Sequence, residues 1–156
     1  MPVTPFHMGP ALLAKAAAPR RFSLVIFGVS QVVIDVEPLV GLFTGAAVLH
    51  GFSHTLTGAT LIAIASALAG RSLCERVLGL LNGRPTLIGT TAAWSGAFVG
   101  TYSHLVLDGM MHYDMKPFAP LTDANPILGA MSVLGIYLFC VVSGVVGGLA
   151  LQWRLS

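Results

Sequence analysis

Long apolar stretches constrain the fold of this chain more than any other feature of its sequence. A helix needs about 20 mostly apolar residues to cross the hydrocarbon core of a bilayer. Three stretches are long enough, or nearly so, and contain no acidic residue: 56–70, which is extendable at either end, 85–107 and 126–153. A fourth, 22–40, is apolar except for Asp35 and Glu37. We therefore predict an all-α, polytopic membrane bundle of four long spans that forms one domain over residues 1–156.

The composition agrees with this class of protein. Charged residues make up 9% of the chain and hydrophobic residues 55%, whereas soluble domains are about a quarter charged. No basic leader precedes an apolar run at the N-terminus, so we expect no cleavable signal peptide. The two cysteines, Cys74 and Cys140, fall in different predicted settings and give no disulfide pattern. We expect membrane lipids as partners and no nucleic acid.

The basic residues predict the orientation of the spans. Seven of the eight fall in three places, namely Lys15, Arg20 and Arg21, then Arg71, Arg76 and Arg84, and finally Arg154. Basic residues concentrate in cytoplasmic loops, so these three places are expected on the cytoplasmic side of the membrane. The four spans then alternate in direction without contradiction, and Lys116 alone lies on the outer side.

The segment before Arg20 allows two interpretations. Thr4 as N-cap and Pro5 in the first turn predict a helix over 5–18, about 21 Å long. If the chain reverses at 18–21, this helix forms a hairpin with the first span and brings His7 level with Asp35 and Glu37. The alternative is a short amphipathic helix on the cytoplasmic surface, which would leave His7 far from the other ionisable residues.

All five histidines and four of the six acidic residues gather near the other membrane face, and this is where we expect the functional site. The set comprises His7, Asp35, Glu37, His50, His54, His104, Asp108, His112 and Asp114. His50 and His54 are four residues apart, as are His104 and Asp108, and residues at this spacing share a helix face. Pro38 marks the end of the first long helix beside Asp35 and Glu37.

Ionisable groups at membrane depth are tolerated mainly when they pair, line a wet cavity or bind an ion. Each motif alone has a simpler explanation, such as an interfacial histidine or a solvated helix end. The convergence of three paired motifs instead predicts a metal site, and imidazole with carboxylate favours zinc, manganese or iron(II). The candidate ligands are His7, Asp35, Glu37, His50, His54, His104 and Asp108, with His112, Asp114 and Ser103 as supporting residues.

Small residues and loop residues predict packing rather than chemistry. Gly96 with Gly100, and Gly144 with Gly148, form GxxxG steps that allow membrane helices to approach closely. Thr122 and Asp123 are predicted to cap the last helix.

Four short motifs in order, TPFH, IDVEP, LHGFSHT and SHLVLD, resemble the YdjM-type family of inner-membrane metal-dependent hydrolases. The usual family pattern is TH near the start, then PDxD, HRGxTHS and SHxxxD. Ile34 stands where proline is usual, and Glu37 replaces the second aspartate. Gly51 follows His50 where arginine is usual, so an anion-clamping arginine has no counterpart at that position.

The family in turn resembles the zinc-dependent phospholipase C and S1/P1 nuclease fold. That resemblance implies a helical protein in which histidines and aspartates hold a cluster of zinc ions. His104 and Asp108 match its HxxxD pair, Asp35 would bridge metals, and His7 with His50 or His54 would be further ligands.

The leading hypothesis is a membrane-bound metal-dependent hydrolase that cleaves a lipid or isoprenoid phosphoester with metal-activated water. It would use two or three zinc ions, with manganese or iron as alternatives, at a site facing the outer side. Asp35 and Glu37 are the candidate catalytic residues, Asp35 as a metal bridge and Glu37 as a ligand or general base. The other hypotheses are a metal transporter, a haem protein with His54 and His104 as axial ligands, and a non-enzymatic scaffold with a structural metal.

Overall fold

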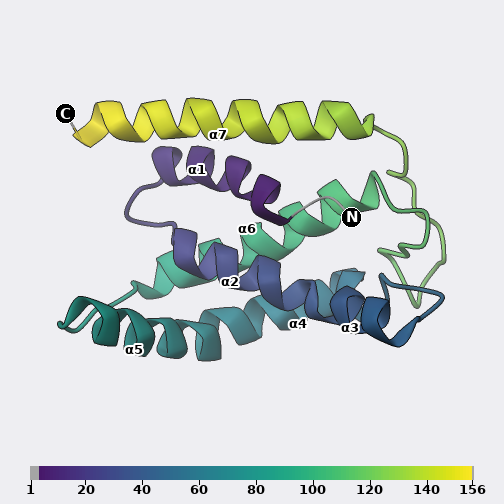
Figure 1. The fold of residues 1–156 in the computed structure, drawn as a ribbon, viewed down its shortest axis with the longest axis horizontal. Coiled ribbons are helices and arrows are strands. Elements are labelled where there is room, and N and C mark those ends of the chain that lie inside the picture. Colours follow the sequence, from purple (N-terminus) through teal and green to yellow (C-terminus); the bar gives the residue numbers. More distant parts are fainter. Residues whose placement is uncertain (1–3, 156) are drawn as a thin grey trace.

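The computed structural model describes residues 4–155, and within them the chain forms only helices and loops (Figure 1). The elements are η1 (Thr4–His7), α1 (Met8–Ala17), α2 (Leu24–Ile34), α3 (Val36–Thr44), η2 (Phe52–His54), α4 (Leu56–Ala65), η3 (Ser66–Gly70), α5 (Arg71–Asn82), α6 (Thr90–Gly109) and α7 (Val133–Leu155). The short segments η1 and η2 are 3-10 turns, and η3 is a π-helical turn that continues α4 into α5. The all-α prediction is confirmed for these residues.

The prediction of four long spans is wrong. In the described residues three helical stretches are long and apolar enough to cross a membrane, Leu24–Thr44, Leu56–Asn82 and Val133–Arg154. The predicted span 85–107 corresponds to α6, which runs from Thr90 to Gly109 and contains Thr, Ser, Tyr, His and Asp side chains. Because α6 lies inside the bundle and buries eleven of its twenty residues against other helices, it does not need the lipid-compatible surface of a span.

The first long helix is divided at Asp35, where α2 ends and α3 begins. Pro38 was predicted to end this helix, but it occupies the first turn of α3, which continues to Thr44. Proline is tolerated in a first helical turn because the missing N–H would have no partner inside the helix there. The helix is therefore interrupted at Asp35, three residues before the proline, and continues through Pro38.

The chain reverses between α1 and α2, but the predicted packing of α1 as a hairpin onto the first span is wrong, because its main packing partner is α7 (Figure 1). The reversal is held by Lys15, whose Nζ donates to the carbonyl oxygens of Pro19 (2.6 Å) and Phe22 (2.8 Å). A Cβ at Gly9 would collide with the carbonyl of Cys140, and one at Gly147 would collide with backbone atoms of α1. The missing side chains let the two backbones touch, so α1 lies along α7.

Glycines also set the contact between α2 and α6. A Cβ at Gly96 would meet the carbonyl of Ser23, and one at Gly100 would meet the Ser30 hydroxyl. The predicted packing role of Gly96 and Gly100 is therefore confirmed. On α7 the predicted packing role holds for Gly144, where an added Cβ would lie 3.3 Å from the Cα of Gly9. It does not hold for Gly148, where a Cβ would have no neighbouring atom within 4 Å, and the tightest contact belongs to Gly147.

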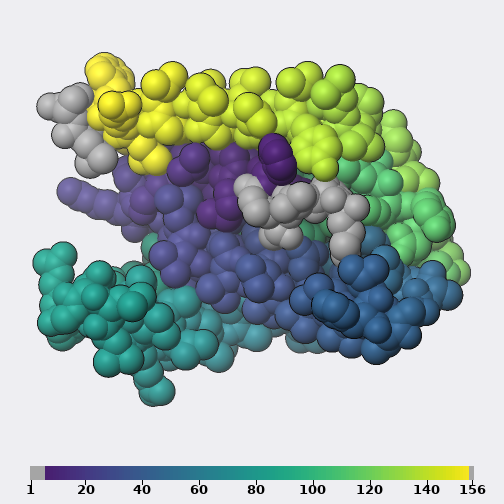
Figure 2. Space-filling model, in the orientation of Figure 1, coloured from purple at the N-terminus to yellow at the C-terminus, as the bar shows by residue number. Residues whose placement is uncertain are grey.

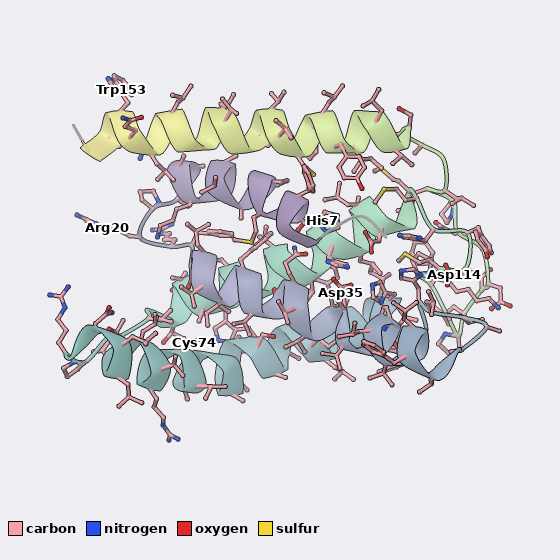
Figure 3. All side chains as sticks on the ribbon, viewed as in Figure 1. His7, Arg20, Asp35, Cys74, Asp114 and Trp153 are labelled. Atoms are coloured by element: carbon pink, nitrogen blue, oxygen red, sulfur yellow. The ribbon has the colours of Figure 1, made fainter. Side chains whose placement is uncertain are left out.

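The bundle has one apolar half and one polar half. The core of the apolar half is formed by Ile26 of α2, Ala63 and Ala67 of the α4–η3 segment, and Ala93 and Ala97 of α6. Figure 3 shows Arg20, Cys74 and Trp153 toward the end of this half, and Asp114 at the opposite end of the molecule. His7 and Asp35 lie between the two ends, inside the bundle.

Apolar side chains cover the outer surface of α7. This helix runs along one edge of the molecule in the space-filling view (Figure 2). Its exposed residues include Leu134, Leu138, Val142, Val145 and Leu149. A helix face of this composition is suited to lipid.

Candidate metal centre

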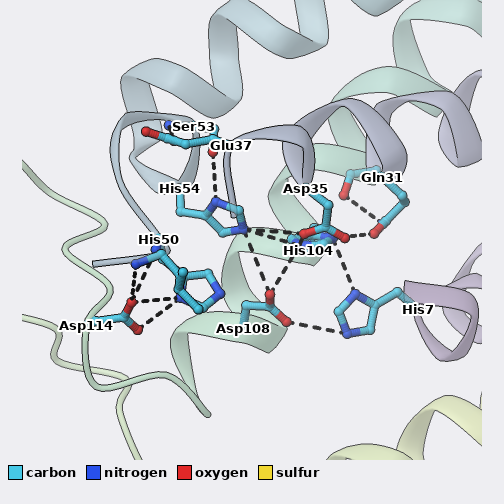
Figure 4. A network of polar contacts seen from close by, with 12 residues as sticks. His7, Gln31, Asp35, Glu37, His50, Ser53, His54, His104, Asp108 and Asp114 are labelled. Atoms are coloured by element: carbon cyan, nitrogen blue, oxygen red, sulfur yellow. Dashed lines mark hydrogen bonds and ion pairs between the residues drawn. The ribbon is translucent and has the colours of Figure 1, made fainter. Parts of the chain in front are cut away.

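Four side chains from three parts of the chain converge inside the polar half (Figure 4). Asp35 comes from the α2–α3 break, His54 from η2, and His104 and Asp108 from α6. One nitrogen or oxygen of each lies within 4.8 Å of the corresponding atoms of the other three. We call these residues the four-residue group.

The distances within the four-residue group fit the edges of a metal coordination shell. His104 Nε2 is 3.1 Å from Asp35 Oδ1 and 3.2 Å from Asp108 Oδ2. His54 Nε2 is 3.8 Å and 3.9 Å from the same two oxygens, and 3.4 Å from His104 Nε2. Neighbouring ligands around a tetrahedral ion with bonds of about 2.0–2.1 Å are about 3.3–3.4 Å apart. The contacts of His54 are too long for good hydrogen bonds, and the group could hold a metal ion.

Local structure explains how each member reaches the group. His104 and Asp108 are one helical turn apart on α6, which ends at Gly109. His54 ends the η2 turn, and the next residue, Thr55, caps α4 by accepting a hydrogen bond from Gly58 N (3.0 Å). The Asp35 side chain is 28% exposed, whereas those of His54, His104 and Asp108 are 0–5% exposed. The group is therefore closed by protein on most sides and open beside Asp35.

Two further residues orient the imidazoles, and neither was predicted from the sequence. Gln31 Nε2 donates to the carbonyl of Gly100 (3.0 Å), which turns Oε1 toward His104 Nδ1 at 2.6 Å. His104 Nδ1 is then the protonated nitrogen, and Nε2 presents its lone pair to the group. Ser53 Oγ lies 2.9 Å from His54 Nδ1, within hydrogen-bond distance, and orients that ring. The sequence feature that could have indicated Gln31 is an amide side chain one helical turn before Asp35 in a mostly apolar stretch.

A second group consists of His50, Asp108 and His112. The rings of His50 and His112 stack with centroids 4.2 Å apart, and His112 Nε2 is buried without a hydrogen-bond partner. Asp108 belongs to both groups, whereas Asp35, for which the family resemblance implied a bridging role, belongs to the four-residue group alone.

Asp114 holds His50 in the second group. Its carboxylate oxygens lie 2.9 Å and 3.1 Å from His50 Nδ1 and accept hydrogen bonds from the backbone N–H of Leu49 and of His50. Partial burial would raise the pKa of Asp114, but the hydrogen bonds from His50 and Leu49 hold it below its usual value. Burial and the neighbouring His50 lower the pKa of His112, so this imidazole is neutral at neutral pH and can bind a metal.

His7 approaches the four-residue group from a third side. It is 1% exposed, and its Nε2 lies 3.6 Å from Asp108 Oδ1. Neither of these two atoms has a hydrogen-bond partner. The surface-helix alternative, which would have left His7 far from the other ionisable residues, is therefore wrong. His7 and Asp108 face each other across a gap that a metal ion could fill.

The structure does not bring Glu37 and Ser103 into either group. Glu37 accepts hydrogen bonds from the backbone N–H of Phe52 (3.0 Å) and of Ser53 (2.6 Å), so it fixes the η2 turn that carries His54. Ser103 Oγ donates to the carbonyl of Gly100 on its own helix at 3.1 Å.

The predicted capping of the last helix by Thr122 and Asp123 is also wrong, since α7 begins only at Val133. Thr122 Oγ1 accepts a hydrogen bond from Ala124 N (3.2 Å), and Asp123 forms an ion pair with Lys116. Both residues therefore belong to the loop that follows α6.

Comparisons with known proteins give one match. The family model described as YdjM inner membrane protein matches residues 11–154. That range includes every candidate ligand except His7, which lies just before it. No curated protein and no solved structure matches the chain.

Proposed function

The chain belongs to the YdjM family of inner membrane proteins, and from this premise we propose that it is a membrane-bound metal-dependent hydrolase acting on a phosphoester of a lipid or isoprenoid. The observation that carries the proposal is the convergence of Asp35, His54, His104 and Asp108 at coordination-edge distances inside an otherwise apolar bundle. Buried histidines and carboxylates without a thiolate favour zinc, with manganese and iron(II) as alternatives. Asp35, His54 and His104 would hold an ion together with Asp108, and His50 and His112 could hold a second ion with the same carboxylate.

Bound ions would supply a water of lowered pKa and stabilise negative charge on phosphate oxygens. The protein residues contribute position and orientation. Asp35 is the most exposed ligand of the four-residue group, so water would reach that group beside it. Gln31 and Ser53 fix the two imidazoles of that group. Glu37 takes a positioning role in place of the general-base role considered from the sequence, because both of its oxygens hold the η2 turn.

The similarity to zinc-dependent phospholipase C is part of this proposal and supports phosphoester cleavage as the reaction class. The site would face the outer side of the membrane. This orientation is supported by the distribution of basic residues, which concentrate on the cytoplasmic side. Only Lys116 belongs to the loop between α6 and α7.

The geometry argues against the haem hypothesis. Two axial imidazoles must lie about 4 Å apart, twice a metal–imidazole bond of about 2.0 Å, with a porphyrin between them. His54 Nε2 and His104 Nε2 are 3.4 Å apart, and Asp35 Oδ1 lies within 3.8 Å of both. A transporter is also disfavoured, because both ligand groups found in the described residues include Asp108 and so lie in the same half of the bundle.

The proposal is tested by measuring metal per chain and hydrolysis together in lipid nanodiscs. His104→Ala should lose the ion of the four-residue group, and Asp108→Ala should lose both ions. Each should reduce cleavage of phospholipids and isoprenoid phosphates by more than about 100-fold. Ser103→Ala is the matched control on the same helix and should retain metal and activity, because its hydroxyl bonds only to its own helix.

Two outcomes would overturn the proposal. Unchanged metal content in both His104→Ala and Asp108→Ala would mean that these residues form only a hydrogen-bonded network. Metal bound at full occupancy without hydrolysis of any phosphoester in the panel would favour a structural metal in a non-enzymatic scaffold.

A further inference from the structure

A half-open groove of about 510 Å³ includes His50 in its wall. Its other wall residues come from the segment before α4, from the start of α4 and from the loop that follows α6. They are mostly apolar or small, and include Val48, Phe52, Thr57, Ala119 and Pro120. A groove of this size and lining is typical of small-molecule sites. His50 also belongs to the second ligand group, so the groove adjoins the candidate metal centre.

Lys116 supplies the positive charge of the groove wall. Both of its neighbours in the chain are fixed. Met115 is 1% exposed and packs against Ile34 and Leu105, and the carbonyl of Pro117 accepts a hydrogen bond from Leu56 N (2.8 Å). The lysine is therefore presented to the groove from an anchored segment of the loop.

Lys116 forms an exposed ion pair with Asp123 that another anion can replace. Its Nζ lies 2.7 Å from Asp123 Oδ2, and the two side chains are 53% and 77% exposed. An exposed lysine–carboxylate pair contributes little stability, so an anion with more negative charge can replace Asp123. The other carboxylate in the wall, Asp114, is already bonded to N–H groups of His50 and Leu49, which offsets its repulsion of an incoming anion.

We propose that this groove binds an anionic amphiphile, with its phosphate on Lys116 and its hydrocarbon chain against Val48, Phe52 and Pro120. The identification of this ligand as the substrate rests on the proposed hydrolase function, but its binding does not. The groove then selects phosphate esters that carry an apolar chain over soluble ones, and Lys116 selects anionic head groups over cationic ones.

The test is binding of dodecylphosphonate, which has no ester bond to cleave, to the full chain in neutral nanodiscs by calorimetry. Lys116→Met should weaken binding at least about tenfold, since a charge-assisted hydrogen bond is lost. Lys116→Arg should stay within about threefold of the wild type because it keeps the charge, and Asp123→Asn should bind more tightly because a competitor is removed. Arg84→Gln, in the loop between α5 and α6 and outside the groove wall, is the control and should leave binding unchanged.

Two further probes each lack one part of the ligand: methylphosphonate lacks the long hydrocarbon chain, and dodecyltrimethylammonium lacks the negative charge. Both should bind at least about tenfold more weakly than dodecylphosphonate. Equal binding of methylphosphonate would indicate a free-phosphate site and overturn the proposal. Equal binding of the cationic amphiphile, or no loss in Lys116→Met, would indicate partition into lipid and would also overturn it.

Measuring phosphoester hydrolysis alongside dodecylphosphonate binding tests the groove proposal and the hydrolase proposal separately. Phosphoester cleavage whose KM does not change in Lys116→Met, together with unchanged dodecylphosphonate binding, would reject the groove and keep the hydrolase. Lys116-dependent binding in a protein that cleaves no phosphoester would support the groove and reject the hydrolase.

Discussion

At the scale of single residues, the candidate centre depends on side chains that touch the ligands as much as on the ligands. The Gln31 amide is fixed by the Gly100 carbonyl and in turn fixes the proton of His104 on Nδ1. Glu37 has the corresponding role for His54 through the backbone of η2. Gln31 and Glu37 are polar residues of α2 and α3, which are mostly apolar. The free-energy cost of placing them at membrane depth is offset because they orient the side chains of the site.

Gln31→Leu should weaken metal binding about 10- to 100-fold, because His104 Nδ1 loses its acceptor and the ring can turn away. The measurement is a competition titration against a chelator of known affinity. Gln31→Glu keeps an acceptor for His104 Nδ1 but loses the donor to the Gly100 carbonyl, so it should restore only part of the affinity. Equal affinities of Gln31→Leu and the wild type would show that packing alone orients His104.

At the scale of elements, two features of the helices determine the site. The break between α2 and α3 releases the Asp35 side chain from a regular helix face, and the contact of α1 with α7 carries His7 into the bundle. The second feature depends on glycine, since Gly9 and Gly147 are the positions where the two backbones meet. A defect in this contact should therefore affect both stability and the metal centre.

Gly9→Ala and Gly147→Ala should each destabilise the protein by about 1–3 kcal/mol, because the added Cβ meets backbone atoms that cannot move aside. Metal affinity should fall as well, since His7 directly precedes α1 and would move with it. Gly148→Ala is the matched control on the same helix, where the added Cβ has no neighbour within 4 Å and the change should be neutral or slightly stabilising. Thermal unfolding in detergent measures the first effect and a chelator titration the second. Equal unfolding temperatures for the three variants would contradict this account of the interface.

At the scale of the whole molecule, the apolar half and the polar half lie at opposite ends of the bundle (Figure 3). The α1–α2 turn and the C-terminal end of α7, which carry Arg20 and Trp153, lie at the same end as α5. The loop that follows α6 carries Lys116 and Asp114 and lies at the end with the candidate centre. This division matches the separation of basic residues from ionisable ligands along the sequence.

Cysteine labelling in intact cells should therefore distinguish the two ends. In a background of Cys74→Ala and Cys140→Ala, Thr122→Cys should react with a membrane-impermeant maleimide and Asn82→Cys should not. Both positions are exposed in the structure, so accessibility within the protein does not explain a difference. Disruption of the cells should make Asn82→Cys reactive. The reverse pattern in intact cells would place the candidate centre on the cytoplasmic side.

The sequence by itself determined the class of the protein and the identity of most candidate ligands. Apolar length and low charge predict a helical membrane protein because unpaired backbone groups cannot exist in lipid. The spacing of His104 and Asp108 predicts a shared face because the period of a helix is fixed. Such local rules do not depend on the tertiary structure. The family assignment made from short motifs is also confirmed, over residues 11–154.

Only the tertiary structure decided which residues meet and which helix faces lipid. The burial of α6, the contact of α1 with α7 and the sharing of Asp108 between two groups depend on contacts between residues far apart in the sequence. Gln31 meets His104 across 73 positions, and Glu37 holds a turn fifteen positions away. No local spacing rule encodes such pairs, because they follow from how closely the backbones pack, and that closeness is set by single glycines such as Gly9 and Gly100.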